Sequence, residues 1–134
     1  MAQIQRFNPP GLAPPPGNRY AHVVVSGDRV WIAGQTSRDA NGNTVGLNNA
    51  IAQCKQVYTN LRTAIESVGG TFANIVKVTI FMTSESYLPA ARAAQDDCWG
   101  DSPLPASSMV IVKALARPEY FIEIEAEAVI EGLG

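Results

Sequence analysis

The hydrophobic pattern of the chain predicts five β-strands and two helices. Segments rich in β-branched residues, where side chains alternate between two faces, are typical of strands. They span residues 21–26, 29–35, 75–83, 107–113 and 120–130. In the third, Val76, Val78, Ile80 and Met82 fall on one face. Gly27-Asp28 separates the first two segments and is typical of a tight turn, so these two strands are expected to form a hairpin.

Two further segments show the three- and four-residue steps of a helix. The first spans residues 48–68, with Asn48 as the expected N-cap and Gly69-Gly70 as the end signal. Its apolar face comprises Ile51, Cys54, Tyr58, Leu61, Ile65 and Val68. The second spans residues 87–99 and ends before the proline-rich stretch 102–105. Its apolar face comprises Leu88, Ala91, Ala94, Cys98 and Trp99.

This order of elements, β-β-α-β-α-β-β, predicts an α+β fold. Both helices follow strands, so they are expected to pack on one face of a mixed sheet. The strands are apolar on both faces at residues 23–25, 30–33 and 75–81, which is unusual for a sheet with one face in water. Burial of the second face against further copies of the chain would resolve this, so we expect a homo-oligomer.

The N-terminal segment differs in composition from the rest of the chain. Residues 8–18 (NPPGLAPPPGN) are too rich in proline and glycine for a helix or a central strand. We therefore expect residues 1–17 to be an extended lead-in over the surface of a single domain formed by residues 18–134, with regular structure beginning near Tyr20. No apolar run is long enough for a signal peptide or a membrane span, which predicts a cytoplasmic protein without a membrane partner.

Composition and charge narrow the classes of function. The chain has 134 residues, of which 46% are hydrophobic and 16% charged, with a formal net charge of −2. No basic stripe is present for a phosphate backbone to follow, so no nucleic-acid partner is expected. Cys54 and Cys98 lack metal-ligand spacing and are expected to be reduced thiols. No nucleotide loop or metal motif is visible, and neither cofactor nor metal is predicted.

The last strand carries the most conspicuous titratable groups. Glu123, Glu125 and Glu127 lie on one face, opposite an apolar face. They could form a solvated face or an ion-pair ladder with Lys77 and Lys113. Alternatively, one of them could be a general acid or base at the edge of a cleft. The residues alone do not choose between these interpretations.

Tyr20, Gly34 and Arg92 each allow a structural and a functional interpretation, whereas His22 has a structural one. Tyr20 could line a pocket or pack against the proline-rich lead-in. Gly34 invites close approach by a ligand, or marks a β-bulge. Arg92 is either a solvated or ion-paired cation, or faces a carboxylate ligand. His22 is the only histidine, and a lone histidine in a strand is usually structural.

Five segments, taken in order, resemble the Rid family of YjgF-like reactive-intermediate deaminases, which were also described as endoribonucleases. They are residues 18–23 (NRYAHV), 30–35 (VWIAGQ), 68–70 (VGG), 74–81 (NIVKVTIF) and 122–126 (IEIEA), within a match from about 17 to 131. The resemblance implies a chorismate-mutase-like α+β fold and a homotrimer with clefts between neighbouring subunits. It also implies hydrolysis of imine or enamine acids to keto acids and ammonia.

The resemblance further implies roles for individual residues. Glu123 matches the glutamate that helps position water, and Tyr20 and Gly34 match cleft positions. An arginine that follows a Pro-Ala pair grips the substrate carboxylate in active members, and here that position is Ser107. Met109 matches a cysteine two residues further on.

Ser107 changes what the resemblance predicts about activity. A guanidinium offers a carboxylate two parallel charged hydrogen bonds, whereas a hydroxyl offers one neutral bond. Deamination of the usual substrates is therefore expected to be weak or absent, unless Arg92, near a polar cleft position, supplies the charge. Our first hypothesis is a hydrolase for an imine, enamine or aminomuconate-like acid, and the second is a non-catalytic binding or sensing protein for small carboxylates. An endoribonuclease is the remote third.

Overall fold

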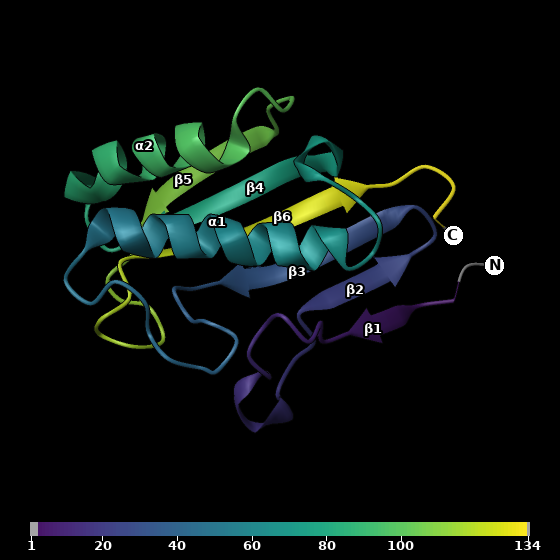
Figure 1. Cartoon of the computed structure of the whole chain (residues 1–134), viewed down its shortest axis with the longest axis horizontal. Helices are drawn as coiled ribbons and strands as arrows, with labels where there is room; N and C mark the ends of the chain where they lie inside the picture. The colour runs from purple at the N-terminus through teal and green to yellow at the C-terminus, as the bar shows by residue number, and fades with distance from the viewer. Residues whose placement is uncertain (1–2, 134) are drawn as a thin grey trace.

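A computed structural model describes residues 3–133 and shows a six-stranded mixed sheet covered on one face by two helices (Figure 1). The strands are β1 (Gln5–Phe7), β2 (Val23–Ser26), β3 (Arg29–Gln35), β4 (Ile75–Met82), β5 (Ala106–Ile111) and β6 (Ile122–Val129). The helices are α1 (Ala50–Glu66) and α2 (Leu88–Trp99), with 3-10 turns η1 (Pro16–Asn18), η2 (Phe72–Asn74) and η3 (Glu85–Tyr87). The predicted α+β class, the mixed sheet and the shared face of the helices are confirmed.

The sheet has the order β1-β2-β3-β6-β4-β5. All neighbouring strands are antiparallel except β4 and β5, which are parallel. Parallel neighbours need a crossover connection, and α2 supplies it between β4 and β5. The last strand in sequence, β6, thus lies between β3 and β4, and its residues are held on both sides.

Regular structure begins earlier than the sequence predicts. Gln5, Arg6 and Phe7 form β1, which pairs with β2 at the sheet edge, so the expectation that regular structure starts near Tyr20 is wrong. The proline-rich composition applies only from residue 9, and the segment before it is free to add a strand. Part of the lead-in is also buried, at Leu12 and Ala13.

The ends of α1 differ slightly from the prediction. Asn49, not Asn48, is the N-cap, and its side-chain oxygen accepts a 3.0 Å hydrogen bond from the amide of Ala52. Gly69 adopts a left-handed conformation (φ +85°) after the helix, as the end signal predicts. Ile51 was expected on the buried face but is 46% exposed, because it belongs to the first turn at the helix edge.

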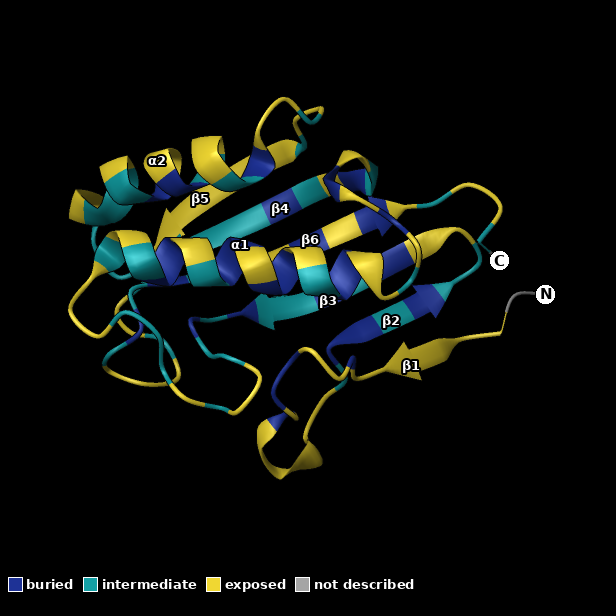
Figure 2. Ribbon diagram, viewed as in Figure 1, coloured by how far each residue is buried: buried dark blue, intermediate teal, exposed yellow. Residues whose placement is uncertain are grey.

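The core lies between the two helices and the sheet (Figure 2). The largest fully buried apolar side chains include Leu61 and Ile65 of α1, Met82 of β4, and Ile122 and Ile124 of β6. Alternation along β6 places its glutamates on the uncovered face, as predicted. None of the helices formed by residues 3–133 is long and apolar enough to cross a membrane.

One strand departs from simple alternation. Between Ile75 and Lys77 the register of β4 against β6 shifts, which is the signature of a β-bulge. Ile75 is therefore buried while Val76 is exposed. The prediction that Val76 shares a face with Val78, Ile80 and Met82 is wrong because a bulge reverses the alternation at that point.

Candidate functional site

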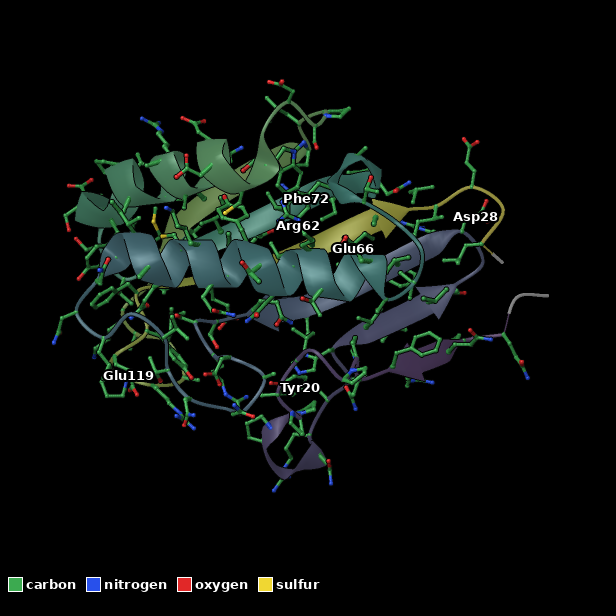
Figure 3. All side chains as sticks on the ribbon, viewed as in Figure 1. Tyr20, Asp28, Arg62, Glu66, Phe72 and Glu119 are labelled. Carbon is green, nitrogen blue, oxygen red and sulfur yellow. The ribbon has the colours of Figure 1, made fainter. Side chains whose placement is uncertain are left out.

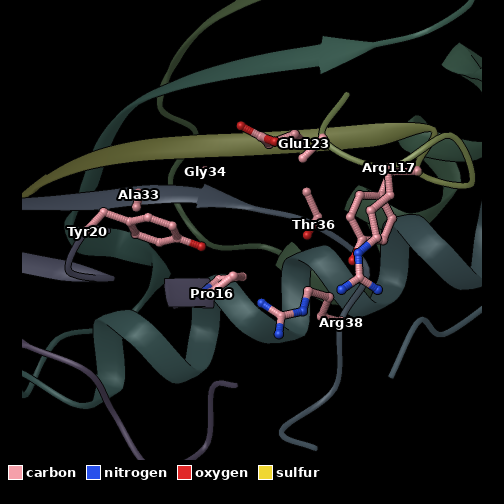
Figure 4. A pocket seen from close by; sticks show the side chains of 10 residues that line it. Pro16, Tyr20, Ala33, Gly34, Thr36, Arg38, Arg117 and Glu123 are labelled. Carbon is pink, nitrogen blue, oxygen red and sulfur yellow. The ribbon is translucent and has the colours of Figure 1, made fainter. Parts of the chain in front are cut away.

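A pocket of about 350 Å³ opens beside the uncovered face of the sheet, where β3 ends and β6 begins (Figure 4). Its walls come from η1, the end of β3 and the two loops that follow β3 and precede β6. The lining residues are Pro16, Tyr20, Ala33, Gly34, Thr36, Arg38, Ala116, Arg117, Tyr120 and Glu123. Three of the residues predicted from sequence, Tyr20, Gly34 and Glu123, thus meet in one place.

Gly34 and Glu123 occupy adjacent strands and contact each other directly. The register between β3 and β6 shifts between Ile32 and Gln35, so Gly34 lies in an irregular stretch of β3. A Cβ atom on Gly34 would lie 2.8 Å from Cδ of Glu123, closer than such contacts occur. The irregularity supports the interpretation of Gly34 as a bulge position. The group that lies against Gly34 is the Glu123 carboxyl, and close approach by a ligand stays a prediction.

The environment of Glu123 alters its acidity. Burial raises the pKa of the Glu123 carboxyl above its ordinary value, and the nearby Glu125 carboxylate raises it further. Glu125 and Glu127 are exposed on the same strand face. Glu123 is half-buried in the pocket of about 350 Å³, whereas Glu125 and Glu127 are exposed and line a second pocket of about 130 Å³ beside Lys77. Glu123 is therefore the strongest candidate of the three for proton exchange.

Tyr20 lines the pocket and contacts the ring of His22. Its ring meets the ring of His22 edge-on, with centroids 5.7 Å apart, and the residue is 45% exposed. Burial raises the pKa of the Tyr20 phenol, Arg38 opposes the shift, and Glu123 and Tyr120 add to it. Figure 3 shows Tyr20 among the loops at the end of the sheet where β2 begins, away from Asp28 in the β2–β3 turn.

His22 is structural, as predicted. Its Nε2 lies 2.6 Å from the carbonyl oxygen of Ala13, and its Nδ1 lies 3.2 Å from Nε2 of Gln35. These contacts fit an imidazole that donates from Nε2 and accepts at Nδ1. They attach the lead-in to β3 and so fix the η1 wall of the pocket.

Two buried polar residues of α1 hold the loops that carry the remaining pocket residues. Asn60 donates hydrogen bonds of 3.0 and 2.9 Å to the carbonyls of Thr36 and Arg38. Gln53 donates a 2.7 Å bond to the carbonyl of Glu119 and accepts a 2.9 Å bond from the amide of Phe121. One helix thus positions both loops by contacts to their backbones.

Sequence reasoning missed four polar residues of this pocket. Thr36 and Arg38 follow β3, and Arg117 and Tyr120 precede β6. Loop residues show no periodicity, so no pattern indicates that these two segments meet. The available signal was indirect: Gln53 and Asn60 interrupt the apolar side of α1, and buried amides need backbone partners.

The other predicted site residues lie elsewhere in the chain. Ser107 neighbours Val78 in the sheet and shares its helix-covered side, whereas Glu123 neighbours Phe81 and projects from the uncovered face. Ser107 lines a separate pocket of about 180 Å³ with residues that include Trp99 and Pro105. Met109 on β5 and Arg92 on α2 are exposed.

The predicted site residues therefore form two groups within a chain, and only the group around Glu123 converges. Ser107, Met109 and Arg92 do not line the Glu123 pocket.

The remaining titratable groups fit no ion site among the described residues. Residues 3–133 contain no cluster of three histidine, cysteine, aspartate or glutamate side chains that could hold a metal ion. Cys54 and Cys98 are free thiols, and burial raises the pKa of Cys54 to about 12. The ion-pair ladder, one of the interpretations of the three glutamates, is not formed among residues 3–133, where Lys77 Nζ instead donates a 2.8 Å bond to Ser108 Oγ.

Comparison with known proteins places the chain in a family. Residues 11–130 match the family described as "Endoribonuclease L-PSP". A crystal structure of a Rid-family protein from Yersinia pestis has the same fold, with a TM-score of 0.87 and 26% identity, and covers 96% of this chain and 100% of its own. The chain belongs to the Rid family.

Two further proteins are similar to this chain in sequence. A 2-iminobutanoate/2-iminopropanoate deaminase from Dermatophagoides farinae is 31% identical over 120 residues, which are 90% of this chain and 92% of that protein. A crystal structure titled as a putative endoribonuclease from Thermotoga maritima is 34% identical, with a TM-score of 0.85 over 96% of this chain and 99% of its own. The resemblance found in the sequence is thereby confirmed at the level of the family.

Proposed function

We propose that this Rid-family chain hydrolyses imine or enamine forms of small carboxylic acids, with Glu123 as the proton-exchanging group. The observation that carries the proposal is the Glu123 carboxyl, held over Gly34 in a pocket that also contains the Tyr20 phenol. The similarity to a protein named as an imine deaminase supports the reaction class.

The reaction requires only water and proton transfers. The oxygen of water adds to the imine carbon while Glu123 accepts one water proton and delivers it to the imine nitrogen, which gives a carbinolamine. Glu123 then transfers the hydroxyl proton of the carbinolamine to nitrogen, and the carbon–nitrogen bond breaks to release ammonia and a keto acid. An enamine first gains a proton on its β-carbon to become the imine. A carboxyl with a raised pKa suits both transfers near neutral pH.

We also propose that the chain acts as a homotrimer with clefts between neighbouring subunits. The uncovered face and the exposed strand β5 offer Met109, Val110 and Ile111 for burial against a neighbour (Figure 2). Such an assembly would bring Ser107, Met109 and Arg92 of one copy towards the Glu123 pocket of the next. Light scattering on the purified protein tests this, and a monomer would contradict it.

A non-catalytic protein that binds small carboxylates is the second candidate. It is favoured by Ser107, which stands where the family resemblance places an arginine. An endoribonuclease has less support, because the sole histidine is buried in two structural contacts.

The test is hydrolysis of freshly generated 2-iminobutanoate and 2-iminopropanoate, followed as keto-acid appearance against the spontaneous rate. Glu123→Gln serves as the matched inactive control. We expect acceleration by the parent protein alone. Equal rates with parent, variant and buffer across a panel of imino acids would refute the enzyme, and a rise in melting temperature with keto acids would then favour the binding protein.

A further inference from the structure

The Glu123 pocket contains two cations that no sequence pattern indicated. Arg38 comes from the loop after β3, and Arg117 from the loop before β6. Figure 4 shows Glu123 on the wall formed by the strands and both guanidinium groups on the opposite side, with Thr36 between them. The pocket therefore has an acidic side and a basic side.

Two donors on the basic side lack partners. Within residues 3–133, the buried side-chain polar atoms without a hydrogen bond are Nε of Arg38 and the hydroxyl of Tyr120, and both residues line this pocket. Tyr120 is only 2% exposed. A buried donor without an acceptor is unfavourable, so two of them in one pocket indicate a place for an acceptor that the chain itself does not supply.

The acidic side of the pocket does not supply that acceptor. Among residues 3–133 the side-chain ion pair within 4.0 Å is Lys55 of α1 with Asp97 of α2, and neither residue lines this pocket. No ion pair within 4.0 Å joins Glu123 to Arg38 or Arg117 among these residues. The guanidinium of Arg38 is therefore not neutralised by a contact with the Glu123 carboxyl.

The basic side is also held in place before any ligand arrives. The carbonyl of Arg38 is fixed by Asn60, and its backbone bridges to Thr44 across the loop. The guanidinium of Arg117 lies 6.0 Å from the centre of the Tyr120 ring. Little ordering is then needed on binding, which favours affinity.

We propose that Arg38 and Tyr120 bind the carboxylate of a small organic acid whose reacting carbon then lies towards Glu123. A guanidinium and a phenol together offer charged and neutral donors to the two oxygens of one carboxylate. The apolar wall formed by Pro16, Ala33 and Ala116 accommodates a short aliphatic chain. The orientation towards Glu123 rests on the proposed function, whereas the carboxylate site itself does not.

The test is calorimetric titration of the full chain with 2-oxobutanoate and with its neutral amide, 2-oxobutanamide. Arg38→Gln should weaken binding of the acid by roughly 10- to 100-fold, because it removes a hydrogen bond between charged groups. It should change binding of the amide by less than about threefold, so the preference for the acid disappears. Tyr120→Phe should weaken binding of the acid by roughly three- to tenfold. Arg6→Gln, which removes an exposed arginine on β1, is the matched control and should change the binding affinity of neither ligand.

Each outcome separates this proposal from the proposed function. Loss of both ligands together in Arg38→Gln would indicate structural damage and overturn the site, as would unchanged binding of the acid in both pocket variants or no binding of the acid to the parent. Tyr120→Phe and Arg38→Gln could selectively weaken binding of the acid while the parent hydrolyses no imino acid. The carboxylate site would then be supported and the proposed hydrolase function refuted. If hydrolysis proceeds with an unchanged KM in both variants, the enzyme stands and this site fails.

Discussion

The pockets around Glu123 and Ser107 lie on opposite faces of the same sheet and differ in what they can bind. The Glu123 pocket combines a carboxyl of raised pKa, two guanidinium groups and two phenols. The Ser107 pocket is about half that volume and is lined mainly by apolar and aromatic side chains. The Glu123 pocket therefore carries positive charge of its own, supplied by the loops after β3 and before β6, whatever residue stands at position 107.

Glu123→Gln tests whether the Glu123 pocket is the catalytic one and should give the largest effect. Removal of a positioned acid–base group typically lowers the rate by about 100- to 10,000-fold. We expect such a loss in kcat for imine hydrolysis, measured by keto-acid formation. Glu127→Gln, on the same strand face but exposed, is the control and should stay near the parent rate.

Gly34→Ala should give the next largest effect. The added Cβ would displace the Glu123 carboxyl, and a misplacement of about 1 Å costs up to roughly 100-fold in rate. Chemical denaturation adds a second measurement, because the strain depends on the Glu123 side chain. Gly34→Ala should destabilise the parent but have little effect in a Glu123→Ala background, and equal destabilisation in both would disprove the contact.

Ser107→Arg tests which pocket holds the substrate carboxylate. If Arg38 performs this role, a new guanidinium at position 107 should change kcat/KM by less than about threefold, because the substrate carboxylate already has a charged partner. Steady-state kinetics with 2-iminobutanoate would show this. A large gain in kcat/KM would place the carboxylate at the Ser107 side of an inter-subunit cleft and contradict its binding by Arg38.

The smallest expected effect is on stability as a function of pH. Because the pKa of Glu123 is raised on folding, the folded chain binds more protons than the unfolded chain between the unfolded and folded values. This group's contribution therefore becomes unfavourable as pH rises through that window. Glu123→Gln should be more stable than the parent at neutral pH and lose that advantage near pH 3, measured by thermal unfolding.

The sequence predicted the elements better than their irregularities. The periodicity of α1 and α2 and the alternation of β6 were sufficient because one face of each is buried. Val76 was misassigned because a bulge depends on the partner strand, which the local pattern does not contain. β1 was missed because three exposed residues at a sheet edge have no hydrophobic signal.

Of the residues that line the Glu123 pocket, the sequence predicted Tyr20, which precedes β2, and Gly34 and Glu123, which lie on strands. Glu123 and Gly34 follow from the family resemblance, and the structure adds the reason why they occur together. Arg38 and Tyr120 come from loops 36–45 and 112–121, whose meeting depends on hydrogen bonds from α1 to backbone atoms. Backbone contacts leave no trace in the sequence of the contacted loop, so these two residues could not be found from it.

That pattern of backbone contacts has a consequence for how such a pocket can diverge. Asn60 and Gln53 contact main-chain atoms at Thr36, Arg38, Glu119 and Phe121. Side chains of the loops can therefore be substituted without changing the path of the loop backbone. Conversely, replacing either amide on α1 would alter every ligand contact from the attached loop at once. Single substitutions in the loops can therefore change which groups line the pocket. The shape of the pocket depends on Asn60 and Gln53, which do not line it.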